Sequence, residues 1–142
     1  MDEHEMVIID RLKRDSRTSL ADVSRELDVT TAQVMDTLED LERQYLKGYT
    51  VVLDYPAMGY HCMALLLRTK GDVNKLIKHL AAHDIVVNVS ALAGRYDVLC
   101  EVTFKQQALL DEFVKGLAKN HSVIDMELMP QLRLERREGH RL

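Results

Sequence analysis

Three short segments in the first third of the chain carry apolar residues at helical spacing. In the third segment, Val34, Leu38 and Leu41 fall at positions i, i+4 and i+7, which places one apolar stripe along a helix. Thr30, followed three positions later by Gln33, is typical of the capping box that begins a helix. A connection of about three or four residues joins the second and third segments, so the pattern predicts a helix-turn-helix.

After Lys47 the apolar pattern changes from helical to alternating. The β-rich residues 49–54 predict a strand that leaves the helical unit. Further strands are expected at 60–68, 85–93, 98–104 and 123–134, and helices at 73–82 and 106–119. This order predicts an α+β fold, in which a ferredoxin-like βαββαβ antiparallel sheet domain follows the helix-turn-helix. The expected parts are a helix-turn-helix domain at 1–48, a linker strand at 49–59 and the sheet domain at 60–142.

The second face of this sheet is expected to be apolar, like the first. Residues 62–67 alternate between two faces that are both apolar, one formed by Cys62, Ala64 and Leu66 and the other by Met63, Leu65 and Leu67. The next expected strand is also apolar on both faces, at Val86, Val87 and Val89. Helices cover only one face of such a sheet, and a large exposed apolar face is a liability in a monomer. We therefore predict a dimer or higher oligomer that buries the second face.

Composition excludes several classes of protein. The chain has 142 residues, 46% of them apolar, which is enough to build a core. Its longest apolar run, residues 62–67, is far shorter than the roughly 18 residues of a membrane span, so no membrane partner is expected. The acidic start of the chain is unlike a secretory signal, and two cysteines fit a reducing compartment. We expect a cytoplasmic protein.

Charge is distributed unevenly along the chain. Residues 1–47 hold 7 basic and 12 acidic side chains, a net charge of −5, whereas residues 48–142 hold 12 and 11, a net charge of +1. The acidity therefore lies almost wholly in the helix-turn-helix part.

Several motifs resemble those of the Lrp/AsnC regulators. They are the segment 12–24, the pair Leu41-Glu42, the stretch Lys47-Gly48-Tyr49-Thr50 with Gly59 beyond it, and the turn Gly94-Arg95-Tyr96-Asp97, which is similar to the family's Gly-x-Tyr-Asp turn. The resemblance covers nearly the whole chain. It implies a winged helix-turn-helix that binds double-stranded DNA, joined to a sheet domain that dimerises through its sheet. It also implies assembly into octamers or other higher forms, and sensing of amino acids.

The candidate DNA contacts lie on the third helix, because a recognition helix enters the major groove with its N-terminal residues. They are Thr30, Thr31, Gln33, Asp36 and Thr37, and the basic residues Arg43, Arg17 and Lys47 are further candidates for contact with DNA. Gln can pair with adenine and the Thr methyl group can touch thymine. Thr30 and Gln33 can equally serve only as the cap of the helix, and both roles can coexist.

Acidic residues on the same helix oppose DNA binding. Asp36, Glu39 and Asp40 cluster opposite the apolar stripe, and Arg43 is the only basic residue of the helix. Affinity for DNA comes largely from Lys and Arg side chains that neutralise phosphates. Compensating charge could come from other basic residues, namely Lys13, Arg14, Arg17, Arg25, Lys47 and the basic tail Arg133, Arg136, Arg137 and Arg141.

The turn formed by Gly94, Arg95, Tyr96 and Asp97 is the candidate effector site. Its backbone N–H groups and one carboxylate could hold the α-carboxyl and α-amino groups of an amino acid. The simpler alternative is a turn that needs Gly94 for its backbone angles and Asp97 for a local hydrogen bond. Where family members often have Thr residues that help hold the effector, this chain has Asp125-Met126-Glu127.

No other chemistry is expected. The chain has no catalytic constellation, and no cofactor or metal is predicted, because His79 and His83 lack an obvious third ligand. Sirohaem decarboxylases resemble the same two-domain layout, but the stretch around Gly94 offers one Arg and no His. A second alternative is a family paralogue with weak or lost DNA binding that acts by forming hetero-oligomers with other regulators.

Overall fold

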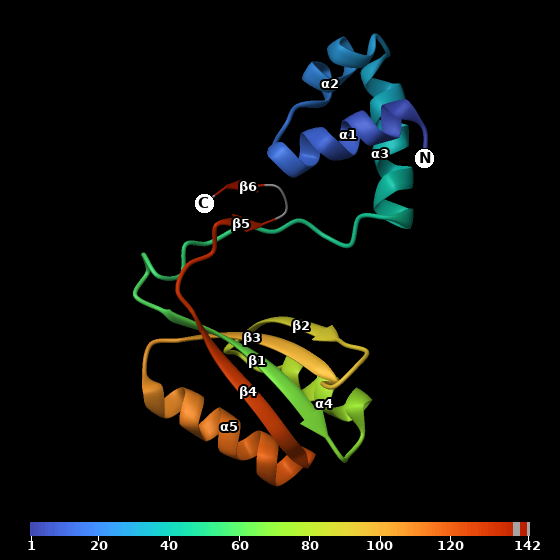
Figure 1. Cartoon of the computed structure of the whole chain (residues 1–142). Coiled ribbons are helices and arrows are strands. Elements are labelled where there is room, and N and C mark those ends of the chain that lie inside the picture. The colour runs from blue at the N-terminus through green and yellow to red at the C-terminus, as the bar shows by residue number, and fades with distance from the viewer. Residues whose placement is uncertain (138–139, 142) are drawn as a thin grey trace. The chain divides into compact units, whose positions relative to one another are not determined.

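Three helices at the N-terminus pack around a small apolar core. The structure is a computed structural model that describes residues 1–137 and 140–141. Its first helices are α1 (Glu3–Arg14), α2 (Leu20–Leu27) and α3 (Thr31–Gln44) (Figure 1). The core is formed by Ile8, Val23, Val34 and Leu41, and Leu38 packs against it. The predicted apolar stripe of the third helix is therefore confirmed.

Local hydrogen bonds explain where α2 ends and α3 begins. Asp28, which follows α2, adopts the left-handed conformation with φ 53° and turns the chain. The Thr30 hydroxyl accepts from the Gln33 N–H at 3.2 Å, and the Gln33 side-chain oxygen accepts from the Thr30 N–H at 2.9 Å. This reciprocal pair is the predicted capping box, and it satisfies two N–H groups that the first turn leaves without helical partners.

The second part of the chain is the predicted βαββαβ unit. Its elements are β1 (His61–Thr69), α4 (Val73–Ala81), β2 (Val86–Ala91), β3 (Val98–Phe104), α5 (Gln107–His121) and β4 (Val123–Gln131). The antiparallel sheet has the order β2-β3-β1-β4, and both helices pack on one face (Figure 1). Leu65 and Leu67 of β1 meet Leu76 and Leu80 of α4 and Leu117 of α5 in a fully buried core. The last strand ends three residues earlier than predicted.

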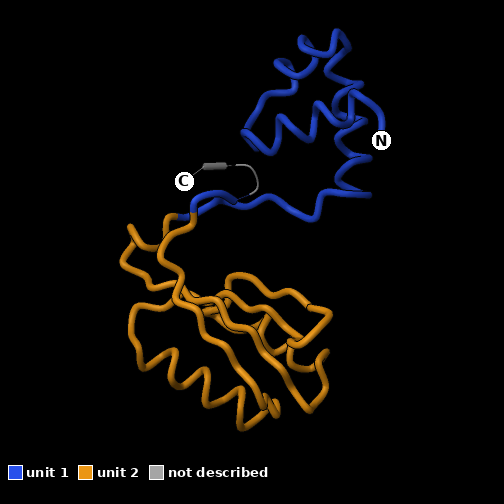
Figure 2. The backbone as a smooth tube through the Cα atoms, in the orientation of Figure 1, with its two compact units in different colours: residues 1–53, 135–142 blue, residues 54–134 orange. Residues whose placement is uncertain are grey.

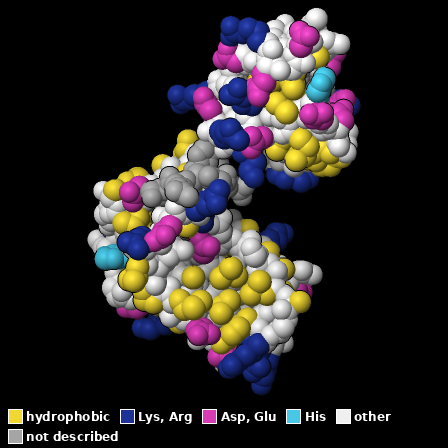
Figure 3. Space-filling model, turned by 45° about the horizontal axis from the view of Figure 1, so that its top comes forward, with side chains coloured by type: hydrophobic (Ala, Val, Ile, Leu, Met, Phe, Trp, Pro, Cys, Tyr) yellow, Lys and Arg dark blue, Asp and Glu magenta, His cyan; other side chains and the backbone are white. Residues whose placement is uncertain are grey.

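The outer face of the sheet is mixed, not uniformly apolar as predicted. The strand register places Asn88, Glu101, Ala64 and Met129 in one row across this face and Ser90, Leu99, Leu66 and Glu127 in the next. A β-bulge between Val86 and Asn88 lets both Val86 and Val89 pack against the helix-covered core. These two valines therefore do not contribute to the outer face. Figure 3 shows hydrophobic side chains gathered on this unit with charged ones around them.

The strand predicted for residues 49–54 does not form. Residues 46–54 have no regular secondary structure, because a strand needs a neighbour for its N–H and C=O groups and no described strand pairs with this segment. The Tyr49 hydroxyl nevertheless donates to Glu42 at 2.7 Å and ties the segment to the end of α3. Partial burial and this carboxylate raise the pKa of Tyr49 to about 12, so the hydroxyl stays a donor.

The described residues after β4 do not pair with the four-stranded sheet. Residues 135–142 group with residues 1–53 in one compact unit, and residues 54–134 form the other (Figure 2). We call them unit 1 and unit 2. Two short strands, β5 (Arg136–Arg137) and β6 (His140–Arg141), pair in this tail. Within the described residues, unit 1 therefore has its two strands in the C-terminal tail. It has no β-wing in the described segment directly after α3.

A histidine pair at the ends of α4 and α5 predicts a pH effect on unit 2. The rings of His79 and His121 lie 4.3 Å apart, and burial followed by the charge of His79 lowers the pKa of His121. Because the unfolded chain then binds more protons than the folded one, stability should fall as the pH drops from neutrality through the lowered pKa. We expect His121→Gln to reduce this pH dependence between about pH 7 and pH 5.5 in denaturant unfolding. The matched variant His4→Gln, at an exposed position of α1, should leave it unchanged.

Candidate DNA interface and ligand loop

The N-terminal half of α3 presents a polar surface to solvent. Thr31 and Asp36 are exposed, while Thr37 is half-buried and donates its hydroxyl proton to the Gln33 carbonyl at 2.9 Å. Val34, Leu38 and Leu41 point into the core, which fixes the rotation of α3 and the direction of this surface. The geometry suits contacts with base edges in a major groove.

Two of the predicted DNA contacts are occupied by the helix cap. The Gln33 side-chain oxygen accepts from both the N–H and, at 3.2 Å, the hydroxyl of Thr30. Bidentate pairing with adenine needs that oxygen as well as the side-chain NH₂ group. The structure therefore shows the capping role for Thr30 and Gln33. It leaves Thr31, Asp36 and the methyl group of Thr37 as the open part of the predicted set.

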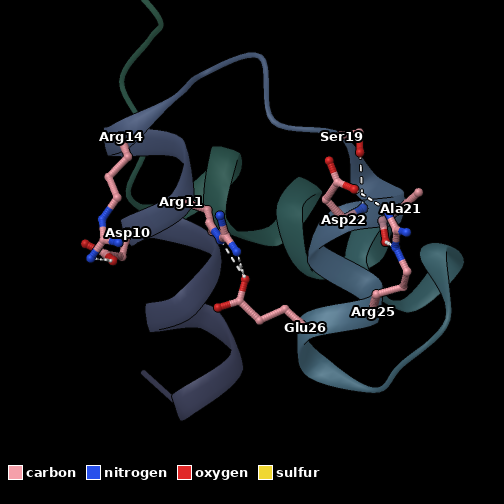
Figure 4. A network of polar contacts seen from close by, with 8 residues as sticks. All are labelled: Asp10, Arg11, Arg14, Ser19, Ala21, Asp22, Arg25 and Glu26. Atoms are coloured by element: carbon pink, nitrogen blue, oxygen red, sulfur yellow. Dashed lines mark hydrogen bonds and ion pairs between the residues drawn. The ribbon is translucent and has the colours of Figure 1, made fainter.

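All four arginines in the three helices form ion pairs. Arg43 lies 2.6 Å from Asp40, Arg14 lies 2.7 Å from Asp10, and Arg11 pairs with Glu26 at 2.5 Å. Arg25 pairs with Asp22 (Figure 4). The side chains of all these pairs are well exposed, so the pairs add little to stability and can exchange partners. By contrast, Lys13, Arg17 and Lys47 are exposed and make no ion pair with any described residue.

The predicted ligand loop is held in shape by Gly94 and Asp97. Gly94 has φ 124°, a conformation that side-chain-bearing residues rarely adopt. The Asp97 N–H donates to the Leu67 carbonyl at 2.8 Å, and its carboxylate accepts from the Thr69 N–H at 2.9 Å. The predicted local hydrogen bonding of Asp97 is therefore present. Its two hydrogen bonds fasten the loop to the end of β1.

The other two loop residues reach a different strand. The Tyr96 hydroxyl donates to Glu127 at 3.1 Å, and the Arg95 guanidinium lies 3.6 Å from Asp125, both on β4. Desolvation and the bond to Glu127 raise the pKa of Tyr96. Asp125 and Glu127 thus belong to the loop site, although the sequence marked them only as a departure from the family pattern. The loop thus brings a cation to Asp125 and a hydroxyl group to Glu127.

The remaining candidates carry no further site. The structure brings His121 to His79, yet the described residues include no group of three or more His, Cys, Asp or Glu side chains able to hold a metal ion. Both cysteines are reduced thiols, and burial raises the pKa of Cys100 to about 12, which keeps it neutral. Among the described residues, no helix is long and apolar enough to cross a membrane.

Known proteins are similar to this chain in sequence or in fold. It is 30% identical over 120 residues to an uncharacterized HTH-type transcriptional regulator of Pyrococcus abyssi (strain GE5 / Orsay), a match covering 82% of each chain. The structure of B. subtilis LrpC is similar with a TM-score of 0.80 at 16% identity, covering 94% of this chain and 96% of that one. A regulator from Neisseria meningitidis, NMB0573 in complex with L-Met, is similar with a TM-score of 0.78 at 18% identity, covering 96% and 93%.

These features define a helix-turn-helix regulator with a separate sheet domain. The family profile described as the Lrp/AsnC ligand binding domain matches residues 63–137, which is more than half of the chain. The chain belongs to the Lrp/AsnC family of transcriptional regulators. Similarity to proteins named as regulators favours this function over the decarboxylase alternative.

Proposed function

We propose that the protein regulates transcription by inserting α3 into the major groove of its operator. The observation that carries this proposal is the exposed N-terminal face of α3, held outward by the unit 1 core in a chain of this family. Thr31 and Thr37 supply hydroxyl and methyl groups to base edges, and Asp36 can accept from the N4 amino group of cytosine. Lys13, Arg17 and Lys47, which lack ion-pair partners among the described residues, contact phosphates.

The acidic character of α3 is consistent with a specific but weakly held complex. Arg43 is engaged by Asp40, and the helix also carries Asp36 and Glu39. Fewer neutralised phosphates lower the affinity for any DNA, whereas contacts to bases retain the difference between sequences. Binding should therefore be strongest at low salt.

A dimer built on the outer sheet face would present two copies of unit 1 to a pseudo-palindromic operator. Ala64 and Leu66 of the central strand β1 and Leu99 of β3 form a half-buried apolar centre on this face, and Glu101 and Glu127 flank it. An apolar centre with a charged rim is typical of protein interfaces. Association of dimers into octamers, or with family paralogues, would bridge several operators.

An amino acid is the proposed effector, bound at a subunit interface beside the loop of Gly94, Arg95, Tyr96 and Asp97. Two observations support this choice, namely the match to a ligand-binding domain and the similarity to a regulator described in complex with L-Met. The loop lies on the sheet unit, so a ligand there could favour one oligomer over another and change which operators are bridged.

The experiment that tests the function is a mobility shift on the protein's own upstream DNA across a salt series. We expect a shift at low salt that weakens as salt rises, and a weaker shift with unrelated DNA of equal length. Absence of any shift at the lowest salt would overturn the proposal and favour a paralogue that acts only through other regulators.

Asp40→Asn should strengthen DNA binding in the same assay. The change removes a carboxylate from α3 and releases Arg43 from an ion pair at 2.6 Å. If Arg43 then contacts one more phosphate, the slope of log affinity against log salt should steepen by about 0.9. Asp111→Asn removes the same charge from an exposed position of α5 and should leave the slope unchanged. An equal effect of both variants would show that only net charge matters.

A further inference from the structure

Met35 is the one large apolar side chain of α3 that stays outside the core of unit 1. The structure describes α3 in full, and the other large apolar residues of this helix, Val34, Leu38 and Leu41, all belong to the core. Met35 is 51% exposed. A methionine side chain is flexible and polarisable, so it adapts to the shape of an apolar partner. Met35 is therefore free to make an apolar contact outside its own unit.

Helix geometry places Met35 on the part of α3 that would enter a major groove. Met35 follows Thr31 by four positions and Ala32 by three, and residues at these spacings are neighbours on a helix surface. Both neighbours are exposed. Because a long side chain on a helix leans toward the N-terminus, Met35 covers the surface over the first turn of α3. Ala32 and Met35 thus form a small apolar patch among the N-terminal residues, which are those that meet base edges.

The polar side chains around this patch are largely engaged within α3. The Gln33 side-chain oxygen accepts from the Thr30 N–H at 2.9 Å, and the Thr37 hydroxyl donates to the Gln33 carbonyl at 2.9 Å. These bonds reduce the number of hydrogen-bonding groups that the first half of α3 can offer to base edges. The apolar patch, by contrast, stays exposed. Apolar contacts are therefore a substantial part of what this surface can offer to DNA.

The apolar group that matches this patch is the C5 methyl group of thymine, which lies in the major groove and distinguishes thymine from the other bases. We propose that Met35 is a specificity-determining residue of α3, which contacts thymine methyl groups in the operator. The inference rests on the proposed function of α3. An apolar contact neutralises no phosphate, so it adds affinity without adding to the salt dependence of binding. It suits a helix on which Arg43 is engaged by Asp40.

The test is a methyl scan of a duplex from the protein's own upstream region, measured by fluorescence anisotropy with the full chain. Each thymine in turn is replaced by deoxyuridine, which lacks only the methyl group. At one or a few positions, the wild type should bind about fourfold more weakly, the effect of one buried methyl-sized group. Met35→Ala should bind the thymine and deoxyuridine duplexes equally at those positions, with the wild-type dependence on salt.

Two further variants separate an apolar contact from a change in the fold. Met35→Leu keeps a large apolar side chain and should keep part of the preference for thymine. Met6→Ala is the matched control, because Met6 lies on α1 and is exposed to a similar extent, 53%. It should keep the whole preference. Alanine favours helices and Met35 lies outside the core, so Met35→Ala should stay folded.

Three results would overturn the role of Met35 while binding by the wild type still supports α3. One is a preference for thymine that persists in Met35→Ala, and another is equal binding of the wild type to every duplex of the scan. The third is a smaller oligomer of Met35→Ala in analytical ultracentrifugation with the thymine preference intact, which would assign Met35 to a contact between protein copies. Failure of the wild type to bind any duplex at the lowest salt would instead refute the function of α3 itself.

Discussion

Leu65→Ala is expected to lower the free energy of unfolding of unit 2 by about 2–5 kcal/mol. Leu65 is 0% exposed on β1, and its register partners are Cys100 on β3 and Leu128 on β4. Truncation removes apolar contacts and leaves a cavity that two strands and two helices cannot close without moving. Since a whole domain is typically stable by about 5–15 kcal/mol, this one change should remove a large part of the stability of the sheet unit.

The loss should be confined to the sheet unit, because each unit has a core of its own. Ile8, Val23, Val34 and Leu41 form the other core, and none of them belongs to the cluster around Leu65. Hydrogen exchange of the full chain should show faster exchange in β1 and β3 of Leu65→Ala, with protection of α3 unchanged. The matched variant Val34→Ala should give the opposite distribution. Faster exchange in both units of either variant would contradict independent cores.

The helices and strands were largely predictable because local rules govern them. The cap at Thr30 and Gln33 and the apolar stripe of α3 depend on residues a few positions apart, and both were confirmed. The strand predicted at 49–54 was wrong, because a β-rich composition indicates only that a segment can pair, whereas a strand requires a partner. The bulge at Val87 likewise depends on the register with β3, which no local pattern specifies.

The candidate sites show the same limit more clearly. Sequence spacing identified the acidic face of α3 but not that Arg43 is held by Asp40, since Arg43 could equally have pointed elsewhere. It identified the Gly94 turn but not that Tyr96 reaches Glu127, because these residues are 31 positions apart and their contact depends on the pairing of β1 with β4. The tail hairpin was invisible to periodicity, because each of its strands has two residues.

Replacing Asp97 should separate the two roles that its carboxylate could have in the ligand loop. Asp97→Ala removes the acceptor of the part-buried Thr69 N–H, a bond of 2.9 Å, and should cost about 1–3 kcal/mol of stability. Asp97→Asn keeps an oxygen at that place and should cost less than about 1.5 kcal/mol, the net worth of an ordinary hydrogen bond. Neither change touches the apolar centre of the outer sheet face, so both variants should still form dimers in analytical ultracentrifugation.

The response to effector should depend on the negative charge of Asp97, whereas stability should depend on its hydrogen bond from the Thr69 N–H. If the carboxylate attracts the α-ammonium group of an amino acid, Asp97→Asn should lose most of the effector response even though the loop keeps its shape. The measurement is a titration of the twenty amino acids against DNA affinity and oligomer size, for wild type, Asp97→Asn and Asp97→Ala. A control at Asp111→Asn changes the same charge on α5 and should respond as the wild type does. Should Asp97→Asn match the wild type while Asp97→Ala fails, Asp97 only fastens the loop to β1, and its carboxylate does not bind the ammonium group.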